Sequence, residues 1–237
     1  MREKRYSEEL IGYLFIIVMM SMIALYENNK GSYYGLMYED GYIFQIMYVS
    51  LFIVEVMLYS KYIDYYLKKQ CALILIRYQS RRKVLTIVLE KLCIRITIVK
   101  VIEVTIYIII NLLRDIKVNY TNVALSLLWG GGATIIICLI QLYIEVRLNG
   151  EYSVVVTSIM HIFFVILGTV IQCELIRYYK KTEIINMIII SNYLYIGRVE
   201  RYICIYGPEI FTVFLAIIFG ELIVLSRHIK KYSVIEN

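Results

Sequence analysis

Long apolar runs separated by short polar segments constrain this chain more than any other feature of its sequence. A helix needs about 20 mostly apolar residues to cross a membrane, because it advances about 1.5 Å per residue through a hydrocarbon layer about 30 Å thick. Runs close to that length occupy about residues 10–26, 42–59, 88–113, 123–146, 154–173 and 209–226. The sequence therefore predicts an all-α, polytopic membrane protein in which six transmembrane helices form a single domain, residues 1–237.

The composition excludes a soluble protein of this length. Hydrophobic residues make up 60% of the 237 residues, and the chain contains a single proline. A soluble domain would need more polar surface than this composition supplies. The apolar runs leave only connecting segments between them, so we expect no separate soluble domain.

The net charge and the cysteines argue against two further classes of protein. The formal net charge is +6, and beside membrane spans such a charge is explained by topology and anionic lipid headgroups rather than by nucleic acid. The five cysteines are odd in number and show no C-x-x-C spacing. We therefore expect buried thiols, and neither a disulfide framework nor a zinc site.

The basic residues predict how the chain is oriented in the cell membrane. Eight of the 25 Lys and Arg residues lie between the second and third apolar runs, in residues 61–91. Short segments rich in Lys and Arg stay on the cytoplasmic side, so we expect this segment and both termini to be cytoplasmic. Residues 174–208 are then extracellular. Their apolar pieces, 184–190 and 193–196, are too short to cross, which predicts re-entrant or interfacial helices before the sixth span.

The segment 61–91 also carries a pattern of its own. The apolar stretch Ala72–Ile76 stands directly before a basic tip that is rich in hydrogen-bonding groups. This arrangement suits an element that rests at the membrane edge and presents its end to another protein. The predicted docking residues are Arg77, Tyr78, Ser80, Arg81, Arg82 and Lys83.

Several ionisable residues lie within the apolar runs or at their ends, and we single out Glu55, Lys100, Glu103, His161 and Glu221. A charge inside the membrane is costly, so it tends to face a partner helix or a wet cavity. Lys100 and Glu103 are three residues apart, so they share a helix face and can neutralise each other. Glu55 and Glu221 fit a transport pathway or an extension to the membrane interface about equally well. For His161, a hydrogen bond to a neighbouring helix and a proton relay both remain open.

The sequence contains no motif for chemistry. The phosphate-binding loop G-x-x-x-x-G-K-[ST], the metalloprotease motif H-E-x-x-H and the nucleophile elbow G-x-S-x-G are all absent,. We therefore expect no enzyme activity, no catalytic residue, no metal site and no cofactor in this chain.

The order of these features resembles a known family. Six spans with both ends inside, a basic inner segment, and an outer segment with two short apolar pieces before the sixth span resemble the type-two exporter family of ABC transporter permeases. The stretch Leu75-Ile-Arg-Tyr-Gln-Ser-Arg-Arg-Lys83 is also similar to the inner segment of the small permeases that accompany lantibiotic and peptide-antibiotic immunity ATPases.

The resemblance implies a permease subunit that expels a peptide antibiotic, a lantibiotic or another amphipathic substrate from a bacterial cell. It implies a second permease chain, identical or different, and a cytoplasmic ATPase dimer that holds ATP and Mg²⁺ and docks near Arg77–Lys83. Two alternatives remain open. One is an ion-coupled secondary transporter or channel subunit with its ions near Lys100 and Glu103, and the other is a non-transporting membrane scaffold or sensor subunit.

Overall fold

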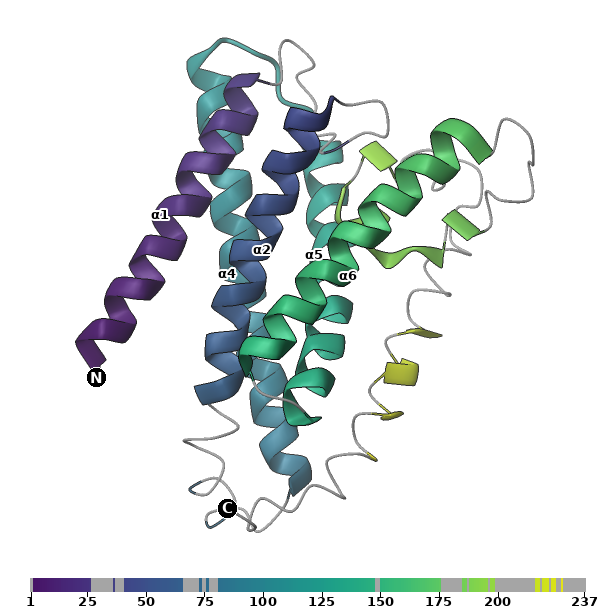
Figure 1. The fold of residues 1–237 in the computed structure, drawn as a ribbon. Helices are drawn as coiled ribbons and strands as arrows, with labels where there is room; N and C mark the ends of the chain where they lie inside the picture. Colours follow the sequence, from purple (N-terminus) through teal and green to yellow (C-terminus); the bar gives the residue numbers. More distant parts are fainter. Residues whose placement is uncertain are drawn as a thin grey trace.

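The computed structural model is all-helical in the part of the chain that it describes, and it contains no strand there (Figure 1). The described residues are 2–26, 36, 41–65, 73, 76, 81–147, 150–175, 185–186, 188–195, 197–198, 216–217, 219–221, 223–224 and 227. The long α-helices are α1 Arg2–Tyr26, α2 Tyr42–Asp64, α4 Arg81–Leu113, α5 Tyr120–Arg147 and α6 Gly150–Val170. A π-helical turn, Ile171–Leu175, continues α6, and a 3₁₀ turn, Ile190–Leu194, follows later in the chain.

Each of these long helices is apolar enough to cross a membrane. The apolar windows are Glu9–Tyr26, Tyr42–Ser60, Thr86–Leu113, Tyr120–Glu145 and Glu151–Glu174. They overlap the first five predicted spans, which confirms, for the described residues, an all-helical fold with several helices long and apolar enough to cross a membrane. The predicted sixth span, 209–226, lies mostly outside the described residues, so the count of six stays a prediction.

Four helices begin earlier than the apolar runs indicate. α1 starts at Arg2 rather than 10, α4 at Arg81 rather than 88, α5 at Tyr120 rather than 123, and α6 at Gly150 rather than 154. Hydropathy marks only the part of a helix that suits hydrocarbon. Arg, Lys and Glu are good helix formers, so the same backbone hydrogen bonds continue beyond that part. As a result, the first turn of α4 takes in the end of the predicted docking tip.

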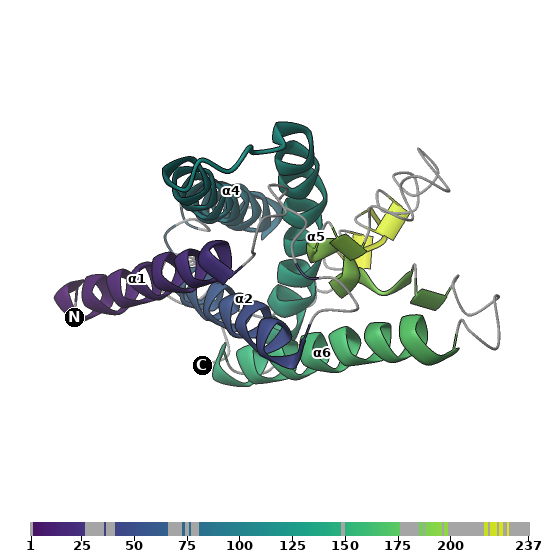
Figure 2. The ribbon, with the colours of Figure 1, turned by 90° about the horizontal axis from the view of Figure 1, so that it is seen from above.

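The helix α2 lies at the centre of the bundle. It contacts α1, α4, α5 and α6, and the view from above shows these four helices around it (Figure 2). Successive helices run in opposite directions, so the end of α2 and the start of α4 lie at the same end of the bundle as the start of α1 (Figure 1). The end of α5 and the start of α6 lie there too. This is the end that we predict to be cytoplasmic.

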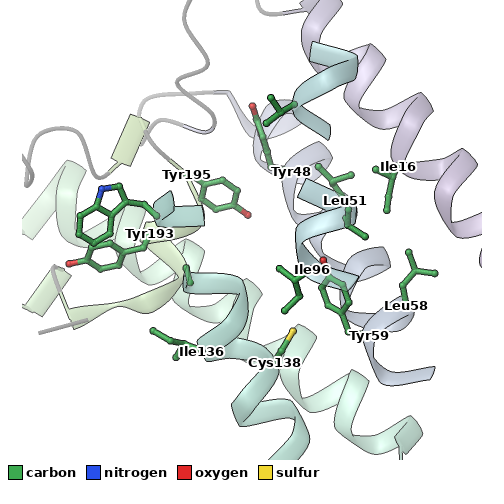
Figure 3. Close-up of a cluster of buried hydrophobic side chains, with 14 of the residues drawn as sticks. Ile16, Tyr48, Leu51, Leu58, Tyr59, Ile96, Ile136, Cys138, Tyr193 and Tyr195 are labelled. Carbon is green, nitrogen blue, oxygen red and sulfur yellow. The ribbon is translucent and has the colours of Figure 1, made fainter. Parts of the chain in front are cut away.

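Apolar and aromatic side chains fill the space between the helices. Figure 3 shows Ile16 of α1, Leu58 of α2, Ile96 of α4 and Cys138 of α5 in one buried cluster. Lipid tails are as apolar as these side chains, so helix association in a membrane depends on close fit more than on burial. The fit is tight between α1 and α2, because a Cβ atom at Gly12 would lie 2.7 Å from a methyl carbon of Leu58.

Polar contacts tie α1 to α4 at both ends of α1. Arg95 of α4 forms an ion pair with Glu9 at 3.0 Å, and its guanidinium lies 4.9 Å from the centre of the Tyr13 ring. At the other end, Arg114 Nη1 donates to the carbonyl oxygen of Ala24 at 3.0 Å. The last carbonyl groups of a helix have no partner within it, so Arg114 caps α1.

Candidate functional site

A buried cluster of three charges joins α2 to α4. Lys100 of α4 places its Nζ 2.9 Å from Oε2 of Glu103 and 2.9 Å from Oε2 of Glu55, which belongs to α2. Glu55 and Glu103 are each 1% exposed. The ion pair predicted from the spacing of Lys100 and Glu103 is therefore present. Glu55 does not extend toward an interface, because its other oxygen, Oε1, also lies 3.0 Å from Lys100 Nζ.

The members of this cluster depend on one another electrostatically. Tyr59, one turn after Glu55 on α2, donates its hydroxyl to Glu55 Oε2 at 3.2 Å. Removing one partner of a buried ion pair costs about 3–5 kcal/mol, because the remaining charge is left without compensation. Lys100 forms ion pairs with both carboxylates, so replacing it leaves more uncompensated charge than replacing either glutamate. The cluster thus holds α2 and α4 in one relative position.

His161 is the centre of a second polar site, where α6 meets α2 and the residues around the 3₁₀ turn. Its Nδ1 lies 3.2 Å from Ser191 Oγ, and its Nε2 lies 3.0 Å from the hydroxyl of Tyr195. Its ring packs against Phe52 of α2 with ring centres 4.0 Å apart. Figure 3 shows Tyr195 extending toward Tyr48 of α2, where the two rings meet edge to face. The hydrogen-bond partners of His161 thus come from the 3₁₀ turn and the residue after it rather than from a long helix, and the relay interpretation stays a prediction.

We call the described residues 185–186, 188–195 and 197–198 the inserted segment, and its 3₁₀ turn packs against both α5 and α6. Its Arg198 is fully buried, with 0% exposure. The guanidinium donates to the carbonyl oxygen of Val165 at 3.1 Å, to Thr169 Oγ1 at 3.0 Å and to Asn192 Oδ1 at 3.2 Å. Because buried charged groups need such partners, these bonds attach the inserted segment to α6.

Two glycines make room for the inserted segment. A Cβ atom at Gly168 of α6 would lie 2.6 Å from Asn192 Oδ1, and one at Gly130 of α5 would lie 3.3 Å from the carbonyl oxygen of Leu194. The helix α5 continues without a break past Gly130. Gly168 therefore permits close approach of the Asn192 side chain and Gly130 that of the Leu194 backbone, as small residues do in packed membrane helices,.

A third polar site lies at the end of the bundle that we predict to be cytoplasmic. Glu145 of α5 accepts hydrogen bonds from Ser60 of α2 at 3.3 Å and from Ser153 of α6 at 3.2 Å. One turn earlier on α5, Gln141 donates to the carbonyl oxygen of Val56 at 3.2 Å. Sequence reasoning missed this site, because a single Glu at the end of an apolar run is usually solvated and no local spacing identifies its partners. It missed buried Arg198 for the same reason.

The predicted docking residues are only partly described. The first turn of α4 contains Arg81, Arg82 and Lys83, at the end of the bundle where α2 finishes (Figure 1). The other three lie outside the described residues: Arg77, Tyr78 and Ser80. The docking role of all six stays a prediction.

Glu221 borders a cavity of about 280 Å³ beside α5, together with Ile140 and Tyr143. Its Oε2 is buried and has no hydrogen-bond partner in the described part of the chain. The structure therefore places Glu221 beside α5. The two roles predicted for Glu221, extension to the membrane interface and a place on a transport pathway, both stay predictions.

Among the described residues, no three His, Cys, Asp or Glu side chains come together as a possible metal site. The cysteines described there, Cys93, Cys138 and Cys173, form no disulfide with one another. The polar groups of the described helices instead form hydrogen bonds and ion pairs between helices, as in a multi-pass helical membrane protein with buried polar clusters. No family model, no curated protein and no solved structure matches the chain. Its resemblance to permeases thus rests on its sequence features.

Proposed function

We propose that the chain is the membrane-spanning permease subunit of an ATP-driven transporter of the type-two exporter kind. Its substrate would be a peptide antibiotic, a lantibiotic or another amphipathic molecule. The sequence has no phosphate-binding loop, so the free energy for transport would come from a separate cytoplasmic ATPase dimer that binds ATP and Mg²⁺. A second permease chain, the same or different, would complete the transporter in a bacterial cell membrane.

The Glu55–Lys100–Glu103 cluster carries this proposal, because it joins the two helices that flank the basic segment 61–91. The helix α2 leads into that segment and α4 leads out of it. A partner that moves the segment would therefore move α2 and α4 as one unit. Because α2 contacts every other long helix that the structure describes, the displacement would reach all of those helices, as coupling to an ATPase requires.

The inserted segment supports the same proposal. His161 lies 11 residues after the start of α6, which is about 16 Å along the helix axis,. Ser191 and Tyr195 reach that depth to contact it. Short turns that interrupt a continuous helix are tolerated at membrane depth only where protein covers their backbone or where it lines a cavity. We therefore propose that this region is re-entrant from the extracellular side and precedes a sixth span at 209–226.

One observation favours an alternative, an ion-coupled secondary transporter. Glu103 Oε1 is buried without a hydrogen-bond partner in the described part of the structure, so a proton or a cation could bind there. Transport would then follow an ion gradient and need no ATPase. A scaffold or sensor subunit would bind a partner through 61–91 and move no substrate.

The test measures uptake of a labelled amphipathic peptide into inside-out vesicles, supplied either with ATP or with an imposed ion gradient. ATP hydrolysis that co-purifies with the tagged chain is measured in parallel. We expect ATP-dependent uptake, and we expect Arg82→Glu to weaken ATPase binding by at least about 30-fold, since losing a charged contact typically costs 2 kcal/mol or more.

Lys117→Glu is the matched control, because it reverses an exposed charge in the turn between α4 and α5, at the opposite end of the bundle (Figure 1). It should leave both activities unchanged. Uptake driven by a gradient alone would favour the ion-coupled alternative. Normal ATPase binding by Arg82→Glu would mean that the basic tip is a topology signal only.

A further inference from the structure

The Glu55–Lys100–Glu103 cluster carries an excess of negative charge. Two carboxylates and one ammonium group leave one negative charge uncompensated when all three groups are ionised. Glu55 and Glu103 are almost fully buried, so water does not compensate that charge. An uncompensated buried charge is costly, and a carboxylate in that position becomes neutral by taking up a proton. The cluster therefore favours one further positive charge.

The titratable groups that face the cluster from neighbouring elements supply no second cation. Tyr59 of α2 and Cys138 of α5 interact with it and are neutral in their ordinary protonation state,. On α4, Arg95 is paired with Glu9 of α1. Two groups act on the cluster without direct contact: His161 of α6 and Tyr195 of the inserted segment. Among the described residues, Lys100 is thus the only cation in contact with the two carboxylates.

One carboxylate oxygen of the cluster has no donor. Both oxygens of Glu55 lie within 3.0 Å of Lys100 Nζ, and Glu103 Oε2 lies 2.9 Å from it. Glu103 Oε1 is buried and has no hydrogen-bond partner in the described part of the chain. The carboxyl groups of Glu103 and Glu55 lie within hydrogen-bonding reach of each other, but ionised carboxylates only accept. A proton on Glu103 Oε1 supplies the missing donor.

The geometry favours a proton over a metal cation. The Lys100 ammonium already bridges the two carboxylates, in the position that a bridging metal ion would take. A metal ion such as Ca²⁺ needs several oxygen ligands around it, whereas Glu103 Oε1 has almost no accessible surface. The described residues also include no group of three His, Cys, Asp or Glu side chains that would hold a metal. A proton needs no such space, because it becomes part of the carboxyl group.

We propose that this cluster is a proton-binding site, in which Glu103 Oε1 takes up one proton from water and shares it with Glu55 in a hydrogen bond. The protonated cluster is neutral, with Lys100 paired to Glu55. At alkaline pH the proton is absent, and Lys100 and Glu103 then act as opposite charges. The site does not rest on the proposed transport function, because it follows from the packing of α2 against α4.

Lys100 provides the access that proton exchange requires. Its side chain is 16% exposed, compared with 2% for each of the two glutamate side chains. Because its ammonium group contacts both carboxylates, it connects them to the less buried side of the cluster. Exchange with solvent is therefore expected even though Glu103 Oε1 itself is buried.

The experiment measures the C=O stretching band of protonated carboxylic acids by infrared spectroscopy on the full chain in lipid nanodiscs. The pH is mildly acidic, so that an exposed glutamate, with a pKa of about 4.3, is still ionised. We expect Glu103→Gln to lower the band by one carboxylic acid per chain. Glu55→Gln should lower it equally, because Lys100 then compensates Glu103 completely. Lys100→Met should raise the band by one carboxylic acid, because neither carboxylate then has a cation.

The two Gln variants keep the size of the side chain, so the test does not depend on Lys100→Met remaining folded. Glu90→Gln is the matched control, because it removes an exposed carboxylate from the same helix. It should leave the band unchanged, as should replacing potassium by sodium in the buffer. A band that Glu103→Gln or Glu55→Gln leaves unchanged would overturn the proposal. Loss of the same signal in sodium would also overturn it, because a metal cation would then occupy the site.

Discussion

Replacing Lys100 by Met tests the buried charge cluster most directly. Met keeps the apolar stem of the side chain and removes the ammonium group from two carboxylates that each lie 2.9 Å from it. Both carboxylates are almost fully buried, so water cannot replace the lost charge. Breaking a buried ion pair by removing one partner costs about 3–5 kcal/mol. We expect Lys100→Met to lower the free energy of unfolding by that amount.

A double-mutant cycle separates this effect from a general loss of packing. Glu103→Gln alone leaves Lys100 paired with Glu55, so it should cost less than Lys100→Met. Combining the two changes removes a positive and a negative charge together. The double mutant should then be more stable than the sum of the single changes predicts, by about 1–3 kcal/mol, as for residues in direct contact.

Unfolding can be followed in mixed micelles with increasing denaturing detergent, through the fluorescence of Trp129, the single tryptophan of the chain. Trp129 is buried and packs 5.8 Å from the ring of Tyr193, so its emission should report loss of tertiary packing. Lys117→Met, an exposed lysine, is the control and should change stability by no more than about 0.5 kcal/mol. Additivity of the two cluster mutations within about 0.5 kcal/mol would refute the paired role of Lys100 and Glu103.

Two further predictions concern topology and close packing. Reporters fused at Met1, near Arg82 and at Asn237 should be cytoplasmic and one near Lys181 external; accessibility labelling checks this, and an external signal near Arg82 would contradict the orientation. Gly168→Ala should destabilise the protein, because the new Cβ would lie 2.6 Å from Asn192 Oδ1, whereas Gly131→Ala, whose Cβ would have no described atom from outside its own helix turn within 4 Å, should be tolerated. Equal thermal unfolding midpoints for the two variants would argue against close packing at Gly168.

Features that depend only on residues close together in the sequence could be predicted from the sequence. The apolar windows of the first five spans follow from residue composition alone, since transfer into hydrocarbon depends on each side chain. The Lys100–Glu103 pair follows from helix geometry, because residues three apart lie on one face. The first residue of a helix could not be predicted from hydropathy. For example, α4 begins at Arg81, which lies outside the apolar window. Polar helix formers extend a helix without changing its hydropathy signal.

The partners that join different helices were decided only by the tertiary structure. Glu55 lies 45 residues from Lys100 in the sequence, and His161 lies 34 residues from Tyr195. Arg198 belongs to a segment that the sequence predicts to be extracellular, where a lone Arg is normally solvated, yet it is fully buried. A helix forms through hydrogen bonds between residues that are close in the sequence. Its rotation about its own axis and its neighbouring helices depend on how all the helices pack together. Hydropathy is nearly uniform around these helices, so it does not indicate which face meets which partner.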